Sequence, residues 1–282
     1  MIKQYFNVKE IMGGVYHINE PIIGSSTVCC TLIVGNEKAL LIDTGYGIGN
    51  LKQIVESITN LPIIFVNSHG HIDHVNGNYQ FDKIYIHKED IAVKNKYATA
   101  DVKNYLIEYF KQQNLQFPEG FSKEAYVNRN DNSVIIPVEE GHVFDLGERE
   151  LEVMYLPGHT NGSIALLDRK NRVLFSGDTI SSHVLMHLEE STSIHTYIKS
   201  LEKVNKLDFD NIIASHFTNP YNKDIINKLI HCASHIDISK STIYANPANP
   251  MEGLMYAEGG EPFVSPNFVS IVYTKDKLME RL

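Results

Sequence analysis

The sequence predicts an α/β protein in which β-sheets pack together with helices on the outside. Two observations lead to this class. Strand-like apolar segments alternate with segments of helical periodicity along the 282 residues. The order of strands followed by helices occurs in the first half of the chain and again in the second. Since domains average about 150 residues, the length allows one large domain or two modest ones.

In the first half, two strands are expected around the turn at residues 35–37, and a helix follows at about Gly49–Thr59, where apolar residues recur at helical spacing. A buried strand over Pro62–Asn67 then leads into the polar segment Ser68-His69-Gly70-His71. The segment Gln113–Asn132 is weakly patterned and is expected to be a surface excursion or lid. The remaining expectations are strands at Thr27–Val34, Ala39–Ile42 and Ile84–Ile86 and helical structure over Lys88–Phe110.

The second half is expected to begin with strands and to end in helices and one further strand. A hairpin turn is expected at Asp168-Arg169-Lys170-Asn171, and an amphipathic helix over Ser193–Leu207. The expected strands are Val143–Asp145, Leu151–Leu156, Ser163–Leu167, Val173–Ser176, Asn211–Ser215 and Phe268–Tyr273, and a last helix is expected at Asp224–Ile236. We predict a main domain over residues 1–240 and an extension, residues 241–282, packed on it.

Composition excludes several classes of protein. The apolar fraction of 43% and the charged fraction of 21% are ordinary for a globular chain. The net charge of -9 disfavours nucleic-acid binding, and no apolar run reaches the roughly 18 residues of a membrane span. Three cysteines, two of them adjacent, do not make a disulfide framework. Together with a start that lacks a secretory signal, this predicts a cytoplasmic protein.

The strongest functional signal is the segment His69-Gly70-His71-Ile72-Asp73-His74, which directly follows a predicted buried strand. Loops at strand ends are where α/β proteins place their sites, and a loop allows side chains at these spacings to converge. Imidazoles with a carboxylate and without a thiolate suit zinc or a similar divalent metal. Three later positions also follow predicted strands and could supply further ligands, namely His159, Asp178 and His216.

Taken together, these residues resemble the pattern of the metallo-β-lactamase superfamily. Every position of its His-x-His-x-Asp-His loop and of its later His, Asp and His is filled in order, over about Tyr16 to Phe217. The resemblance also includes Leu41-Ile42-Asp43-Thr44-Gly45 before the first loop. It implies an αββα sandwich of two mixed β-sheets with flanking helices and a binuclear metal site, most simply of zinc, with iron or manganese as alternatives.

The resemblance also implies a role for each ligand. His69, His71 and His159 would hold the first metal, Asp73, His74 and His216 the second, and Asp178 would bridge the two. Three protein ligands with an open position are the catalytic arrangement of zinc. A bridging hydroxide would be the nucleophile, because the metals lower the pKa of bound water. Asp73 and Asp178 are therefore the expected catalytic residues, and Asp73 can also help to transfer the proton of the hydroxide.

Residues around these ligands have weaker expectations. Asp43, at a strand end, is expected to orient a metal-ligating histidine. Tyr46 beside the first loop, and His183 and His187 after Asp178, are candidates for the substrate pocket, while packing roles are the alternative for all three.

At several positions this sequence differs from the patterns of individual subgroups of the superfamily, and these differences reduce the number of candidate activities. β-Lactamases carry Cys where Asp178 stands, flavodiiron proteins carry Glu where His71 stands, and lactonases carry Tyr where Ser181 stands. Nuclease members carry long insertions and basic surfaces, which are not evident here. The ligand set is nearest to that of glyoxalase II, although its basic C-terminal helical pair is not found.

We therefore predict a glyoxalase II-like metal-dependent hydrolase of small esters or thioesters. The alternatives are a lactonase or phosphodiesterase of the same fold, or a metal-binding ligand sensor without activity. The expected partner is a small molecule, preferably anionic, with no nucleic acid and no membrane, and a homodimer is left open.

Overall fold

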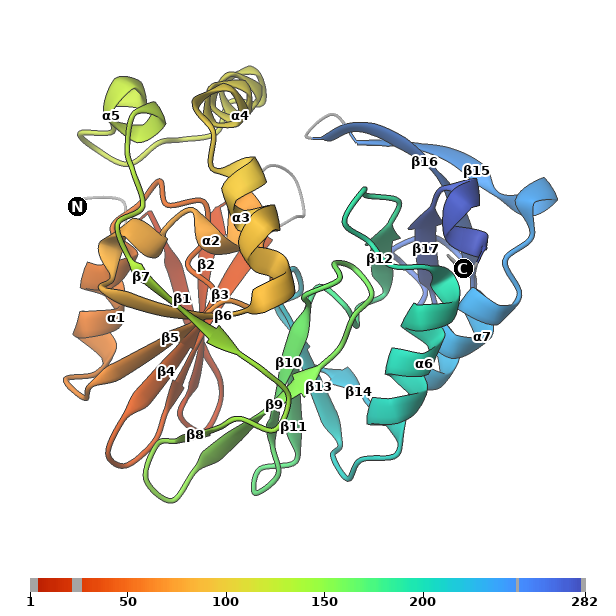
Figure 1. Ribbon diagram of the computed structural model, residues 1–282, viewed down its shortest axis with the longest axis horizontal. Helices are drawn as coiled ribbons and strands as arrows, with labels where there is room; N and C mark the ends of the chain where they lie inside the picture. The colour runs from red at the N-terminus through yellow and green to blue at the C-terminus, as the bar shows by residue number, and fades with distance from the viewer. Residues whose placement is uncertain (1–4, 22–26, 247–248, 280–282) are drawn as a thin grey trace. The chain divides into compact units, whose positions relative to one another are not determined.

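The computed structural model describes residues 5–21, 27–246 and 249–279. It divides into two compact units (Figure 1). The first unit contains Met1–Val153 together with Ser215–Asn219, and the second contains Met154–Ala214 and Pro220–Leu282.

The first unit is built on a mixed seven-stranded sheet with the order β1-β2-β3-β4-β5-β6-β7. Its first four strands are antiparallel, and β4 to β7 pair in parallel. The parallel part places the ends of β4 and β5 side by side, which positions the loops that follow them. The strands are β1 (Asn7–Met12), β2 (Val15–Pro21), β3 (Thr27–Val34), β4 (Ala39–Ile42), β5 (Ile63–Val66), β6 (Lys83–His87) and β7 (Val134–Val138).

The helices of this unit bury apolar side chains in two cores. Helix α1 inserts Leu51 and Val55 into a core with Leu32 and Leu41 of the sheet. A second core joins α4 to Tyr126 of α5 and to Ile72 of α2, and α4 and α5 lie together in Figure 1. The helices of this unit are α1 (Leu51–Ile58), α2 (Ile72–Val75), α3 (Ile91–Tyr97), α4 (Ala100–Gln112) and α5 (Lys123–Val127), with 3-10 turns η1 (Asn78–Gln80) and η2 (Lys88–Asp90).

The chain leaves the first unit through the hairpin of β8 (Val143–Asp145) and β9 (Glu150–Tyr155). In the second unit β10 pairs antiparallel with β11, β11 pairs parallel with β13, and β13 pairs antiparallel with β14. The hairpin expected at residues 168–171 is thus confirmed. These strands are β10 (Ile164–Asp168), β11 (Val173–Gly177), β13 (Asn211–Ala214) and β14 (Tyr221–Asn222).

The second unit holds another sheet, of order β12-β17-β16-β15, and two helices that share a core with it. Helices α6 and α7 pack on each other and bury Leu201 and Leu229 beside Ile271 of β17. The elements are β12 (His183–Met186), β15 (Thr242–Asn246), β16 (Asn249–Glu258), β17 (Val269–Tyr273), α6 (Ile194–Asn205), α7 (Ile225–Ser234), η3 (Ile238–Lys240) and η4 (Lys275–Leu278). The domain boundary expected after residue 240 stays a prediction.

The expected α/β class, with mixed sheets and flanking helices, is confirmed. The sequence-based prediction missed β1, β2, β7, β12 and β14, and it found one of the three strands that follow residue 240. The helical stretch expected over Lys88–Phe110 is interrupted at residues 98–99, because Thr99 is extended and caps α4 through its side chain. The weakly patterned segment Gln113–Asn132 contains α5, which Ser122 caps in the same way.

Candidate metal centre

The motif loop begins where the parallel strand β5 ends. Asn67 follows the strand and donates from Nδ2 to the carbonyl of His74 at 2.9 Å. The backbone N–H of Thr44 donates to the same carbonyl at 2.8 Å. Because the loop is bonded to the strand end that precedes it and to the loop after β4, the short helix α2 starts at a fixed place, with His71 as its extended N-cap residue.

Gly70 allows the loop to pass close to the start of α3. A Cβ atom there would lie 2.7 Å from the carbonyl oxygen of Asp90 and 2.8 Å from the nitrogen of Lys94. The backbone N–H of Gly70 donates to Oδ2 of Asp90 at 2.7 Å. The glycine between the first two histidines of the motif is therefore required by packing.

Asp43 is a fully buried carboxylate that connects three parts of the first unit. Its Oδ1 accepts from the backbone N–H of Ser68 at 2.7 Å, and its Oδ2 accepts from the hydroxyl of Ser68 at 2.7 Å. The same Oδ2 lies 2.8 Å from Nδ1 of His74 and 3.4 Å from the hydroxyl of Ser215. Since a carboxylate accepts, Nδ1 of His74 carries the proton and Nε2 is left as the basic nitrogen.

Asp73, His74 and His216 place one ligand atom each within 4.8 Å of one another. Oδ2 of Asp73 lies 3.4 Å from Nε2 of His74 and 3.4 Å from Nε2 of His216. Burial opposes ionisation of Asp73, but the charge of His74 and His216 when they are protonated, and hydrogen bonds from them, outweigh burial and hold the pKa of this carboxyl well below its usual range. The aspartate is therefore ionised at neutral pH.

The first two histidines of the motif, His69 and His71, also lie in contact with each other in the first unit. Nε2 of His69 lies 3.0 Å from Nδ1 of His71, and both residues are buried. The other ring nitrogen of His69 lies 3.0 Å from the hydroxyl of Ser68. Ser68 thus contacts both Asp43 and His69.

The second unit brings together His159, which follows β9, and Asp178, which follows β11. Nε2 of His159 lies 3.6 Å from Oδ2 of Asp178. Nδ1 of His159 lies 2.7 Å from the carbonyl oxygen of Leu185 in β12. That carbonyl accepts, so the proton of His159 is on Nδ1 and Nε2 faces the aspartate.

These donor sets fit a divalent metal ion. Two ligand atoms bound at about 2.1 Å in tetrahedral geometry lie about 3.4 Å apart, which is the spacing of the Asp73 contacts. Metal-ligating histidines characteristically hold their second ring nitrogen to a carboxylate, hydroxyl or carbonyl. His69, His74 and His159 do so here. Nitrogen and carboxylate donors without thiolate are the ligands of zinc and of similar ions.

The remaining candidate residues lie in different surroundings. The ring of Tyr46 packs edge-on against Phe110, with ring centroids 5.0 Å apart. His183 lies 2.7 Å from the hydroxyl of Ser270, and the ring of the fully buried His187 lies 5.6 Å from that of Tyr244. A contact of any of these residues with substrate stays a prediction.

Sequence reasoning did not single out Ser68, Ser215 or Glu20. The carboxylate of Glu20 accepts from the backbone N–H groups of Tyr46, at 2.6 Å, and Ile48, at 3.3 Å, and so holds the loop that follows Asp43. Each of the three acts through a contact with a residue distant in sequence. The available signals were that Ser68 directly precedes His69 and that Ser215 directly precedes His216.

The mixed sheets, the flanking helices and a histidine–aspartate cluster at strand ends define a metallohydrolase fold. Residues 25–216 match the sequence family described as the Metallo-beta-lactamase superfamily. The chain belongs to this superfamily.

Individual relatives agree with that assignment. "Acyl-coenzyme A thioesterase MBLAC2" of Homo sapiens is 26% identical over 253 residues, covering 85% of this chain and 89% of the relative. "Hydroxyacylglutathione hydrolase GloC" of Haemophilus influenzae is 28% identical over 157 residues, covering 54% of this chain and 66% of the relative. The expected hydrolase of this superfamily is thereby confirmed as a class.

A solved structure supports the fold. The metallo-beta-lactamase from Pontibacter korlensis superposes with a TM-score of 0.59 at 14% identity, covering 82% of this chain and all of that chain. Within residues 5–21, 27–246 and 249–279, none of the helices combines the length and the apolar character that crossing a membrane requires.

Proposed function

We propose that the protein is a binuclear metal-dependent thioester hydrolase. The observation that carries this proposal is the Asp73–His74–His216 cluster, whose spacing and orientation suit a divalent ion. The two relatives named above act, by their names, on acyl-coenzyme A and hydroxyacylglutathione, which are both thioesters. Their agreement on this bond favours thioesters over the lactones and phosphodiesters that other members of the fold attack.

In this proposal, His69, His71 and His159 hold one metal ion, Asp73, His74 and His216 hold the other, and Asp178 bridges them. Bound ions of this kind activate a water molecule and polarise the carbonyl group of the substrate. Zinc is the first candidate, with iron and manganese as alternatives.

The chain's own residues have distinct tasks. The hydrogen bond from Nδ1 of His74 to Asp43 fixes the ring so that Nε2 faces the site. The contact of His159 with the carbonyl of Leu185 does the same in the second unit. Asp73 is ionised at neutral pH and can accept a hydrogen bond from a water molecule at the site.

The test is a hydrolysis panel on protein loaded separately with zinc, iron and manganese. The panel contains a short acyl-coenzyme A, a hydroxyacylglutathione, a lactone, a phosphodiester and a β-lactam. We expect the two thioesters to be hydrolysed fastest, and His74→Ala to abolish that activity. The matched control, His142→Ala, removes an exposed histidine of the first unit and should retain it.

The other outcomes are equally informative. Faster turnover of the lactone or the phosphodiester would replace the substrate class and keep the hydrolase. Tight metal binding without hydrolysis of any substrate would favour the ligand sensor.

A further inference from the structure

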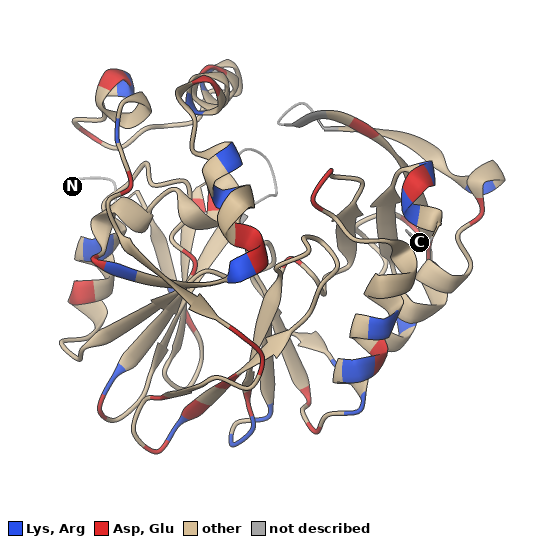
Figure 2. Cartoon of the chain, in the orientation of Figure 1, with Lys and Arg blue, Asp and Glu red and all other residues tan. Residues whose placement is uncertain are grey.

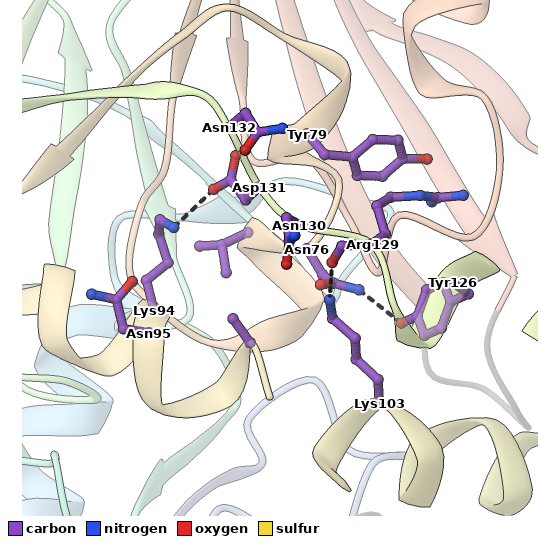
Figure 3. A pocket seen from close by; sticks show the side chains of 12 residues that line it. Asn76, Tyr79, Lys94, Asn95, Lys103, Tyr126, Arg129, Asn130, Asp131 and Asn132 are labelled. Carbon is purple, nitrogen blue, oxygen red and sulfur yellow. Dashed lines mark hydrogen bonds and ion pairs between the residues drawn. The ribbon is translucent and has the colours of Figure 1, made fainter. Parts of the chain in front are cut away.

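The first unit contains a cavity of about 370 Å³ outside the group of metal-ligand candidates. Side chains from α2, α3, α4, α5 and the segment after α5 point into it (Figure 3). Small-molecule sites in proteins have volumes of about 300–1,000 Å³, so the cavity can hold a small organic ligand. Its lining is mostly polar and includes the charged side chains of Lys94, Lys103, Arg129 and Asp131.

The four charged side chains come from three places in the chain, and three of them are cations. Nζ of Lys94, on α3, lies 2.8 Å from Oδ2 of Asp131. Nζ of Lys103, on α4, donates to the backbone carbonyl of Arg129 at 2.8 Å. With one carboxylate against three cations, the cavity lining carries an excess of two positive charges. This contrasts with the chain as a whole, whose net charge is -9. The charged side chains of α3, Lys94 and Lys96, are both cations (Figure 2).

The third cation, Arg129, is held at the wall of the cavity. Its guanidinium lies over the ring of Tyr79, 4.0 Å from the ring centroid, and donates to the carbonyl of Gly47 at 3.2 Å. A guanidinium fixed in this way is preorganised to bind an oxyanion, because little freedom is lost on binding.

The positive charge of Lys103 in the cavity lining is buried and, in the part of the chain that the structure describes, is not balanced by a negative charge. The residue is only 5% exposed. Burial lowers the pKa of its ammonium group, and the neighbouring cations Arg129 and Lys94 lower it further, while Asp131 opposes them. Among the described residues its ammonium has one hydrogen-bond partner, the carbonyl of Arg129, and two of its three protons are left to bind a ligand. Burying a cation without a counter-charge is costly, and a bound anion would remove that cost.

We propose that this cavity binds the phosphate group of a small phosphorylated molecule. A phosphate dianion matches the excess of two positive charges, whereas a carboxylate would neutralise only one. Lysine and arginine side chains bind phosphate oxygens through strong charge-assisted hydrogen bonds. The cavity exceeds the size of a phosphate ion, so part of the organic group can enter with it.

The cavity adjoins the metal-binding loop along the chain. Val75 and Asn76, which line it, directly follow His74. Nδ2 of Asn76 donates to the carbonyl of Tyr46 at 2.7 Å and to the hydroxyl of Tyr126 at 2.8 Å. The phosphate can therefore belong to a separate ligand or to the substrate itself. The second case rests on the proposed function, and coenzyme A thioesters carry such phosphates.

Direct binding is tested by isothermal titration of the metal-loaded protein with inorganic phosphate and with adenosine 3′,5′-bisphosphate. We expect Lys103→Met to weaken binding of the bisphosphate by about tenfold or more, because one charge-assisted contact is lost. Asp131→Asn should tighten it, since the excess charge rises by one. Lys111→Met removes an exposed lysine of the same helix and should leave the affinity unchanged. Phosphate bound at the metal ions contributes equally to the binding measured for the unaltered protein and the three variants. Differences in affinity between these proteins therefore report binding in the cavity.

The source of the phosphate is distinguished by kinetics. If it belongs to the substrate, Lys103→Met raises KM for an acyl-coenzyme A by about tenfold and leaves KM for the phosphate-free acyl-pantetheine unchanged. If the phosphate belongs to a separate ligand, Lys103→Met leaves both KM values unchanged, while titration still shows its weaker binding of the bisphosphate. Affinities that do not differ between Lys103→Met and the unaltered protein would overturn the proposal. A protein that binds the bisphosphate through Lys103 but hydrolyses no thioester would refute the proposed function and leave this site standing.

Discussion

The carboxylate of Asp43 contacts the ring of His74, 31 residues away, with 2.8 Å between Oδ2 and Nδ1. Both residues are fully buried. Asp43 has a left-handed backbone, with φ of 64°, which aspartate tolerates better than most residues. The carboxylate of one loop therefore sets which nitrogen of a candidate metal ligand is available.

The first prediction concerns this contact. Asp43→Asn keeps the size of the side chain but removes its charge, so His74 is held less firmly and its Nε2 becomes less basic. Loss of such an orienting partner lowers metal affinity by about 10–100-fold. Competition with a chelator of known affinity measures the change. Asp101→Asn, at an exposed position in the first turn of α4, should retain full affinity. Equal affinities of the two variants would contradict the orienting role.

The number of metal ions is the second prediction. We expect about two ions per chain in elemental analysis, because the seven candidate ligands are too many for one tetrahedral ion. Removal by a chelator should lower Tm by about 5–10 °C, since ions that bind only the folded state stabilise it. A value near zero after loading with zinc, iron or manganese would refute the metal site itself.

The proposed bridging role of Asp178 gives a third prediction. Asp178→Ala should reduce hydrolysis by about two orders of magnitude or more, because the two ions lose their shared ligand. The circular dichroism spectrum should stay unchanged, and the metal content should fall below two ions. Activity close to that of the unaltered protein would show that Asp178 is not a ligand.

Much of the fold followed from periodicity. Strands such as β3 and β4 have continuous apolar runs, and their predicted bounds agree with the structure. Strand β2 was missed because buried polar residues, His17, Asn19 and Glu20, interrupt its apolar pattern. Strand β16 contains a proline, a glycine and two glutamates, which are rare in strands.

The site, like the fold, contains residues that could be predicted from the sequence and residues that could not. The ligand candidates could be named from the sequence because the motif is dense and each later residue follows a strand. Ser68 and Glu20 could not, because their roles depend on hydrogen bonds to Asp43 and to the backbone of Tyr46. The cationic cavity could not be predicted either, since Lys94, Lys103 and Arg129 meet only after three helices have packed.

Glu20 provides a fourth prediction, about pH. Burial raises the pKa of its carboxyl from the usual 4.5 to about 7, although hydrogen bonds from Tyr46 and Ile48 oppose the rise. The folded state therefore binds this proton more tightly than the unfolded state does. The contribution of Glu20 to stability is greatest below pH 4.5 and decreases as the pH rises to about 7, by about 3 kcal/mol in total.

The measurement compares unfolding in urea of the unaltered protein and Glu20→Gln at pH 5 and pH 8. Glutamine stays neutral, so the stability of the variant relative to the unaltered protein should rise from pH 5 to pH 8. Other titrating groups cancel in this difference. A difference in stability that is the same at both pH values would show that Glu20 keeps an ordinary pKa.

The last prediction concerns the charge of the substrate. In the proposed site, two divalent ions with two aspartates and a hydroxide would give a charge of about +1, within a chain of net charge -9. Fields of this kind attract a small anion to the site, while the acidic exterior repels a long polyanion.

A short thioester that carries a carboxylate should therefore be cleaved with a higher kcat/KM than its neutral analogue. The preference should shrink between 0.01 and 1 M ionic strength, because the Debye length falls from about 30 Å to about 3 Å. RNA and DNA should be poor substrates at every salt concentration. Steady-state kinetics of the matched pair of thioesters across a salt series measures this, and efficient cleavage of nucleic acid without thioester turnover would contradict it.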